Sequence, residues 1–177
     1  MLNFYQNKEQ AKKYLAEADK VLPKISSIAR GKEIIIASDK HKEIFLVPKE
    51  MLHIFNKIRG KGRLLFLGEF FSTIDKGFKP SFNSIAKYAK MIGKRMVIVN
   101  QKGEQTFLYG FNLERKFILS FDRSIKIDDY VVVCNESNEA LGLGRIIFDL
   151  KNSKSEQKVV KNISDLGWYL RHKEGLE

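Results

Sequence analysis

Residue types that could perform catalysis are scarce in this chain. The three histidines, His41, His53 and His172, each lack a second ligand at a spacing typical of a metal site. No serine or cysteine occupies a G-x-S-x-G elbow, which is the local signature of many hydrolases. The single cysteine, Cys134, excludes an internal disulfide and a cysteine-rich zinc cluster, and it follows three valines as a buried small residue would. We therefore expect a protein that binds rather than an enzyme, with no cofactor and no metal.

Asp128 and Asp129 are the one pair of adjacent carboxylates before a hydrophobic strand. Such a pair could act as an acid–base site. Aspartate is also a favoured turn residue, and the valine-rich segment begins directly after this pair. We interpret the two carboxylates as shaping that turn.

The charge of the chain indicates polyanions as partners. Its 32 Lys and Arg against 21 Asp and Glu give a net charge of +11 and a pI near 9.6. Residues 1–93 carry 18 basic and 9 acidic side chains, while residues 94–177 carry 14 and 12. A lysine-rich surface that reflects general composition is the alternative. No apolar run has membrane-spanning length and no cleavable signal opens the chain, so we expect a soluble protein without a membrane partner.

Four cations without an intervening acid form the densest basic cluster: Lys57, Arg59, Lys61 and Arg63. The two glycines among them lack the spacing of a phosphate-binding P-loop, and the segment precedes a predicted strand instead of opening a helix. The cluster is either a second contact to RNA or to a partner, or a solvated turn. The sequence leaves both open.

Residues 1–93 predict an α/β domain. An amphipathic helix over residues 8–22 can be capped by Asn7, with Gln10 as the reciprocal partner. A β-hairpin follows over residues 33–47, and Pro48 then opens a second helix with Met51, Leu52, Phe55 and Ile58 facing inward. Residues 63–67 predict a strand and residues 83–92 a third helix, which Gly93 ends.

Residues 94–177 predict mostly strands. Residues 95–99 form one, and residues 104–109 form a short helix between Gly103 and Gly110, whose backbone N–H groups could meet phosphates. The small residues in the segment 141–144 could let the backbone approach a ligand. A last helix over residues 164–171 would be capped by Ser164. In that helix Trp168 either stacks on bases or packs inward.

Two strings resemble a known family. Residues 104–110, Glu-Gln-Thr-Phe-Leu-Tyr-Gly, and residues 165–172, Asp-Leu-Gly-Trp-Tyr-Leu-Arg-His, are similar to those of the ribosome biogenesis factor family of nuclear import protein seven, in an archaeal form. The second half of the chain looks like the PUA domain of that family, the RNA-binding fold named after pseudouridine synthases and archaeosine transglycosylases. The resemblance implies an α+β fold. An N-terminal antiparallel sheet with surrounding helices would occupy residues 1–93, and a PUA β pseudo-barrel residues 94–177.

The resemblance also implies a function. A member of this family would bind precursor rRNA during maturation of the large ribosomal subunit, together with other assembly or RNA-processing proteins. We expect single-stranded U- or A-rich RNA, a monomer, and a cytoplasmic location in an archaeon or a nucleolar one in a eukaryote. An RNA-modifying enzyme with an appended PUA domain is the alternative. The predicted RNA-binding residues are Lys158, Lys161, Tyr169, Arg171, His172 and Lys173.

Overall fold

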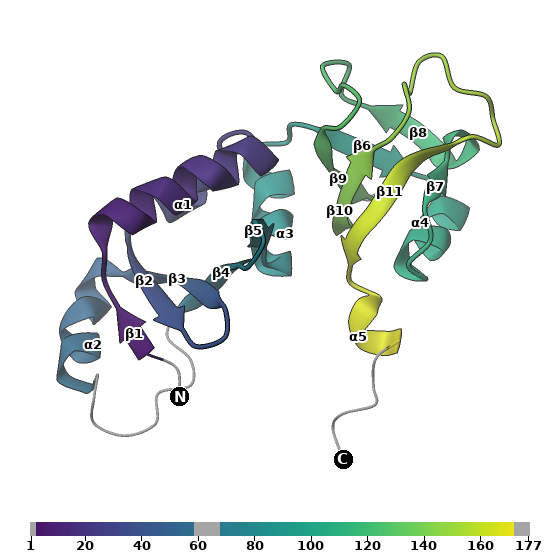
Figure 1. Cartoon of the computed structure of the whole chain (residues 1–177). Coiled ribbons are helices and arrows are strands. Elements are labelled where there is room, and N and C mark those ends of the chain that lie inside the picture. The colour runs from purple at the N-terminus through teal and green to yellow at the C-terminus, as the bar shows by residue number, and fades with distance from the viewer. Residues whose placement is uncertain (1–2, 59–67, 172–177) are drawn as a thin grey trace. The chain divides into compact units, whose positions relative to one another are not determined.

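The computed structural model describes residues 3–58 and 68–171 and separates into two compact units (Figure 1). The first unit ends at Ser84 and the second begins at Ile85, so the division lies inside helix α3 (Phe82–Met91). The sequence prediction placed the boundary after this helix, at Gly93. In both divisions a helix-and-sheet unit is followed by a strand-rich unit, consistent with the expected α+β class.

The first unit is built on a five-stranded antiparallel meander in the order β1-β2-β3-β4-β5. Its strands are β1 (Asn3–Tyr5), β2 (Lys32–Ser38), β3 (Lys42–Pro48), β4 (Glu69–Ile74) and β5 (Phe78–Pro80). The predicted hairpin is confirmed, because β2 pairs with β3 along its whole length. Lys32 lies opposite Pro48 at one end, and Ser38 lies opposite Lys42 at the other. Both strands carry continuous apolar runs that pair across the hairpin, and Ile35, Phe45 and Val47 lie in the core.

Helix α1 (Lys8–Val21) begins as the sequence predicts. The Asn7 side chain accepts a hydrogen bond from the Gln10 backbone N–H at 3.0 Å, and Ala11, Tyr14 and Ala18 are buried along one face. The reciprocal half of the cap is wrong, since the Gln10 side chain accepts from the Tyr5 hydroxyl instead. A 3-10 turn, η1 (Ile25–Ala29), connects α1 to β2.

The second predicted helix is shorter and less buried than expected. A 3-10 turn, η2 (Lys49–Met51), leads into α2 (Leu52–Ile58), and Phe55 is fully buried. Met51 and Ile58 were predicted to face inward, but both are exposed, because one turn and a short helix can turn only a narrow stripe toward the sheet. The predicted strand over residues 63–67 lies outside the described residues.

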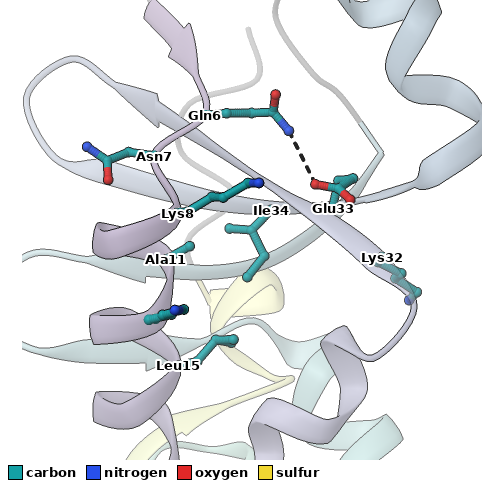
Figure 2. A pocket seen from close by; sticks show the side chains of 9 residues that line it. Gln6, Asn7, Lys8, Ala11, Leu15, Lys32, Glu33 and Ile34 are labelled. Carbon is teal, nitrogen blue, oxygen red and sulfur yellow. Dashed lines mark hydrogen bonds between the residues drawn. The ribbon is translucent and has the colours of Figure 1, made fainter.

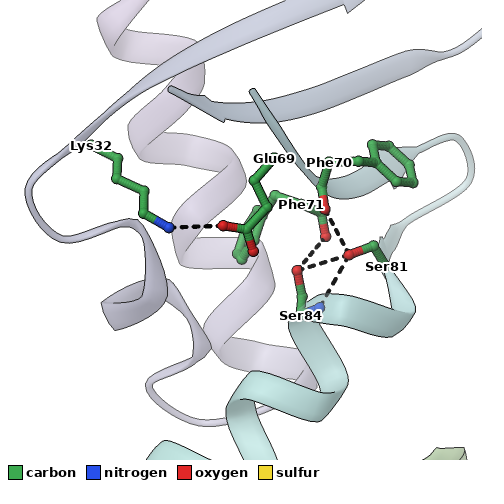
Figure 3. Close-up of polar contacts among 6 residues, drawn as sticks. All are labelled: Lys32, Glu69, Phe70, Phe71, Ser81 and Ser84. Carbon is green, nitrogen blue, oxygen red and sulfur yellow. Dashed lines mark hydrogen bonds and ion pairs between the residues drawn. The ribbon is translucent and has the colours of Figure 1, made fainter. Parts of the chain in front are cut away.

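Two buried serines fix the start of α3 to strand β4 (Figure 3). The hydroxyl of Ser81 donates to the Phe70 carbonyl at 2.8 Å and accepts from the Ser84 backbone N–H at 3.2 Å. The hydroxyl of Ser84 donates to the Phe71 carbonyl at 2.9 Å. Nearby, Lys32 forms an ion pair with Glu69 at 2.9 Å, which joins the ends of two strands. The hydrogen bonds of the two serines position the start of α3, and the ion pair links β2 to β4.

The second unit contains a six-stranded sheet in the order β7-β11-β10-β9-β6-β8. Its strands are β6 (Met96–Val99), β7 (Leu113–Glu114), β8 (Ile118–Phe121), β9 (Tyr130–Cys134), β10 (Ala140–Ile146) and β11 (Lys158–Asp165). The edge strands β7 and β8 are joined by a single 3-10 turn, η3 (Arg115–Phe117), so the two edges of the sheet meet and it forms a nearly closed barrel. Helix α4 (Gln101–Leu108) inserts Phe107 into the core.

The glycines of this unit serve packing rather than ligand approach. Gly103 lies inside α4, where its N–H donates to the Asn100 side chain and a Cβ would come within 2.9 Å of Phe117 and Val99. A Cβ on Gly142 would lie 2.1 Å from the carbonyl oxygen of Ser164 on β11. The sequence predicted that the backbone at Gly103 and in the segment 141–144 could face a ligand, and at Gly103 and Gly142 this is wrong. The small residues let α4 and the strands come close together.

The C-terminal end of the described chain is mainly a strand. Ser164 pairs with Leu143 within the sheet, so β11 continues to Asp165 and the helix α5 (Trp168–Arg171) is a single turn (Figure 1). The predicted helix starting at Ser164 is wrong, because pairing with β10 outweighs the local capping signal. No helix in the described residues is long and apolar enough to span a membrane.

Candidate nucleic-acid interface

Arg171 joins three segments at one end of the barrel. Its two terminal nitrogens each donate to one carboxylate oxygen of Asp165 at 3.0 Å, and one of them also donates to the Leu108 carbonyl at the end of α4. The Asp165 carboxylate is buried, and hydrogen bonding to it raises the pKa of Arg171 above its ordinary value. The guanidinium of Arg171 therefore ties β11 and α5 to α4.

Two glycines make this close junction geometrically feasible. A Cβ on Gly167 would lie 1.9 Å from the Leu108 carbonyl oxygen, so no side chain fits between residue 167 and the end of α4. Gly110 has a φ of +86° and turns the chain sharply after α4, directly beside the Arg171 guanidinium. The end of α4 and the start of α5 thus lie in direct contact.

A cavity of about 250 Å³ lies at this junction. Gln105, Leu108, Tyr109, Gly167 and Arg171 line it, and we call these five residues the junction site. Tyr109 is 69% exposed, and Phe111, two residues further along the chain, is 66% exposed. Trp168 follows Gly167 and is 51% exposed, so of the two roles considered for it, inward packing is wrong. Three large aromatic residues, one in the cavity lining and two within two residues of it in sequence, are thus exposed.

The chemistry of the junction site suits a planar, uncharged group. Exposed aromatic rings offer faces on which nucleobases stack, and the Gln105 side chain supplies both a hydrogen-bond donor and an acceptor. The Arg171 guanidinium already spends its terminal nitrogens on Asp165 and Leu108. The guanidinium therefore stabilises the wall of the cavity more than it provides an unpaired positive charge for a ligand.

A second basic feature lies on β10 and β11. Lys161 is directly opposite Arg145 in the sheet register, and Arg145 is opposite Tyr130 on β9. Arg145 forms an ion pair with Asp128 at 3.0 Å and lies 6.0 Å from the centroid of the Tyr130 ring. Lys161 is exposed and forms no ion pair with any described residue. We call Arg145 and Lys161 the cation pair.

The cation pair has a cost in stability. Like charges directly opposite each other on neighbouring strands destabilise a sheet. Asp128 offsets part of the repulsion from Arg145, and a bound anion would offset the rest. The two acids of the turn thus act as predicted. Asp128 adopts a positive φ in the turn, and Asp129 accepts a hydrogen bond from the Lys126 N–H and pairs with Arg95 at 3.1 Å.

The predicted RNA-binding residues do not gather in one place. Lys158 opens β11 opposite Glu114, and Arg171 lies beyond the other end of that eight-residue strand, about 25 Å away at 3.3 Å per residue. The pKa of Glu114 lies below its ordinary value, mainly because Lys116 donates a hydrogen bond to its carboxylate. The positive charge of Lys158 lowers this pKa further. The side chain of Tyr169 and all of His172 and Lys173 lie outside the described residues.

The predicted N-terminal cluster is only partly visible. Lys57 is exposed in the last turn of α2, while Arg59, Lys61 and Arg63 lie outside the described residues.

Cys134 is buried as predicted, and burial raises the pKa of its thiol to about 12, so it is no nucleophile. Within residues 3–58 and 68–171, no group of three or more His, Cys, Asp or Glu could hold a metal ion.

Sequence reasoning missed the central members of the site. Gln105, Tyr109, Phe111 and Arg145 were not predicted to contact a ligand. A usable signal was present, because Tyr109 and Phe111 flank a glycine directly after a short helix, where aromatic residues have little core to enter. The cation pair carried no such signal, since it depends on the register between β10 and β11.

Curated archaeal proteins are similar to this chain. A UPF0113 protein of Archaeoglobus fulgidus is 27% identical over 144 residues, covering 78% of each chain. A UPF0113 protein of Aeropyrum pernix is 26% identical over 151 residues, covering 84% of this chain and 79% of that protein.

Solved structures share the fold. A conserved PUA domain protein from Thermoplasma acidophilum superimposes with a TM-score of 0.65 at 16% identity, covering 96% of this chain and 97% of that one. A hypothetical protein from Pyrococcus horikoshii does so with a TM-score of 0.63 at 18% identity, covering 93% and 94%. Residues 95–174 match the family model described as the UPF0113 PUA domain. The strand-rich unit that carries the junction site and the cation pair therefore has a PUA fold and is similar to the PUA domain of UPF0113 proteins.

Proposed function

We propose that this protein is a non-catalytic RNA-binding factor that contacts single-stranded RNA through its PUA domain. The observation that carries the proposal is a set of three exposed aromatic residues: Tyr109 lines the cavity of the junction site, and Phe111 and Trp168 lie within two residues in sequence of its lining. Unpaired bases stack on such rings, whereas the bases of a duplex are already stacked on each other. The ligand is thus single-stranded.

Charge and fold support the same proposal. PUA domains typically bind RNA, and the net charge of +11 favours a polyanionic ligand. The cation pair on β10 and β11 offers two positive charges to a phosphate, and the junction site offers stacking surfaces to bases. Phosphate contacts would supply most of the affinity, and stacking would position the strand.

We further propose that the RNA is precursor rRNA of the large ribosomal subunit, in U- or A-rich single-stranded regions. The support is the similarity of residues 104–110 and 165–172 to the family of nuclear import protein seven. These two strings form the wall of the junction site, since Leu108, Tyr109, Gly167 and Arg171 belong to them. The similarity therefore lies at the proposed binding surface.

Photocrosslinking tests the proposal directly. The full chain would be irradiated with a short U-rich RNA that carries 4-thiouridine, and crosslinked peptides would be mapped by mass spectrometry. We expect crosslinks on the peptides that contain Tyr109, Phe111 and Trp168. Phe148 is also an exposed aromatic residue of the PUA domain and serves as the internal control, which should stay unlabelled. Crosslinks confined to the first unit would overturn the proposal.

A further inference from the structure

A groove separates the first half of α1 from strand β2 in the first unit (Figure 2). Its volume is about 380 Å³, and all of its lining residues belong to the segment between Gln6 and Ile34. We call it the α1–β2 groove. It shares no residue with the junction site or the cation pair, so the proposed RNA contact does not account for it.

The floor of the α1–β2 groove is aliphatic. Ala11 is buried, and Leu15 and Ile34 are half-buried, so apolar surface remains accessible to another molecule. Ala11 and Leu15 are four residues apart on α1 and therefore lie on one face of the helix. Figure 2 shows the Leu15 side chain on α1 and the Ile34 side chain on β2 pointing into the space between the two elements. Such a floor fits an aliphatic side chain of a partner.

The rim of the groove is positive along α1. Lys8 and Lys12 are exposed, are four residues apart on the same helix face, and form no ion pair with any described residue. Lys32 on the other side differs, because its ammonium is paired with Glu69 at 2.9 Å. Glu33 supplies one carboxylate, which accepts a hydrogen bond from the Gln6 side chain at 3.4 Å. Two free lysines therefore flank an aliphatic floor.

We propose that the α1–β2 groove binds an acidic segment of a partner protein that inserts an aliphatic side chain between α1 and β2. Its carboxylates would pair with Lys8 and Lys12, and the aliphatic side chain would lie on Leu15 and Ile34. Exposed ion pairs contribute little affinity alone, so the buried aliphatic anchor would supply most of it and the lysines the selectivity.

RNA fits the same groove less well. Within its lining there is no aromatic ring on which a base could stack. The Glu33 carboxylate on the rim would repel a phosphate, whereas a peptide can place a backbone N–H there. The observations therefore favour a peptide over a nucleic acid.

A peptide-display selection tests this proposal. Random linear peptides would be selected on the full chain and the enriched sequences read out. We expect a consensus in which Leu, Ile or Val is flanked by Asp or Glu. A synthetic peptide of that consensus should then bind the Lys8→Glu/Lys12→Glu variant about tenfold more weakly than the wild type, as measured by fluorescence anisotropy.

The charge-reversed variant should fold, because glutamate near the N-terminus of a helix interacts favourably with the helix dipole. The matched control is Lys13→Glu/Lys40→Glu, which makes the same change in net charge at two exposed residues outside the groove lining. We expect the control to bind the peptide within about twofold of the wild type, since neither side chain lines the groove and exposed charges without direct contact contribute little.

Three results would overturn the proposal. The first is the absence of an acidic–aliphatic consensus, and the second is equal binding of the consensus peptide to the Lys8→Glu/Lys12→Glu variant. The third is a loss of affinity for a short U-rich RNA in this variant that exceeds the loss in the Lys13→Glu/Lys40→Glu control, which would assign the groove to RNA.

Discussion

Tyr109, Phe111 and Trp168 keep most of their ring surface in solvent, although burying one aromatic side chain stabilises a fold by about 1.5–3 kcal/mol. A single exposed apolar residue needs no explanation, but several around one cavity indicate a binding surface. At the residue scale these rings are the feature that best distinguishes the site from ordinary barrel surface.

Replacing Tyr109 by alanine should weaken RNA binding without affecting the fold. Stacking of one base on an aromatic ring contributes about 1–3 kcal/mol, so we expect the affinity for single-stranded RNA to fall about 5- to 150-fold. Fluorescence anisotropy with a labelled U-rich RNA measures this change. Phe148→Ala removes an exposed ring elsewhere on the PUA domain and should leave the affinity unchanged. Equal losses in both variants would contradict a localised stacking site.

Arg171 should act mainly through structure. Arg171→Ala would leave the buried carboxylate of Asp165 without its charged partner, so we expect the thermal midpoint of the PUA domain to fall by several degrees. Circular dichroism measures the midpoint. Arg171→Lys keeps the charge but loses the bidentate geometry and should be intermediate. A variant Arg171→Ala with wild-type stability and lost RNA affinity would instead assign Arg171 to RNA, as the sequence prediction had it.

Residue-level prediction succeeded for residues with local causes and failed for those with distant partners. Asn7 caps α1, Cys134 is buried and Asp128 shapes its turn, because each role depends on adjacent residues. The role of Arg171 depends on Leu108, which is 63 residues away in sequence. Only the fold shows such a contact.

At the element scale, periodicity predicted the long elements well. Helix α1, the β2–β3 hairpin and helix α3 were placed within about two residues, because each has a continuous apolar stripe or alternation. The short strands β1, β5 and β7 were not predicted. Two or three residues show no period, and these strands exist only because a neighbouring strand pairs with them.

The turn after β8 should make stability depend on acid. Backbone N–H groups of Ser124 and Arg95 donate to the Asp122 carboxylate and lower its pKa below the ordinary value of 3.8. Because the folded state favours the charged form, this contribution is fully present above that value and is lost as the pH falls through the lower folded pKa. Asp122→Asn should therefore flatten the decline of the urea midpoint below about pH 4. An unchanged decline would contradict this role.

A substitution at Lys161 on β11 should weaken RNA binding without lowering the stability of the sheet. Lys161→Ala removes the repulsion from Arg145 across the strands, so we expect the urea midpoint to stay the same or rise slightly. RNA affinity should fall severalfold, and the slope of log affinity against log salt should shrink by about 0.7, which corresponds to one lost phosphate contact. Filter binding at several salt concentrations measures both. A loss of stability with unchanged affinity would contradict the function of the cation pair.

At the scale of the whole molecule, the chain combines a PUA domain with a first unit that carries its own groove. The family resemblance predicted this order, with a unit of sheet and helices before a PUA domain. It could not show the α1–β2 groove, because the residues of α1 and β2 that form it are separated by the turn η1. The net charge of +11 acts on the molecule as a whole and would make the proposed association with RNA sensitive to salt.

The salt dependence of RNA binding tests the central claim most directly. The affinity of the full chain for a short U-rich single-stranded RNA would be measured over a series of salt concentrations. If about four phosphates are neutralised, log affinity should fall with log salt at a slope of about −3, and Tyr109→Ala should lower every point without changing that slope. A slope near zero, or affinity that does not respond to Tyr109→Ala at any salt concentration, would contradict RNA binding by the PUA domain.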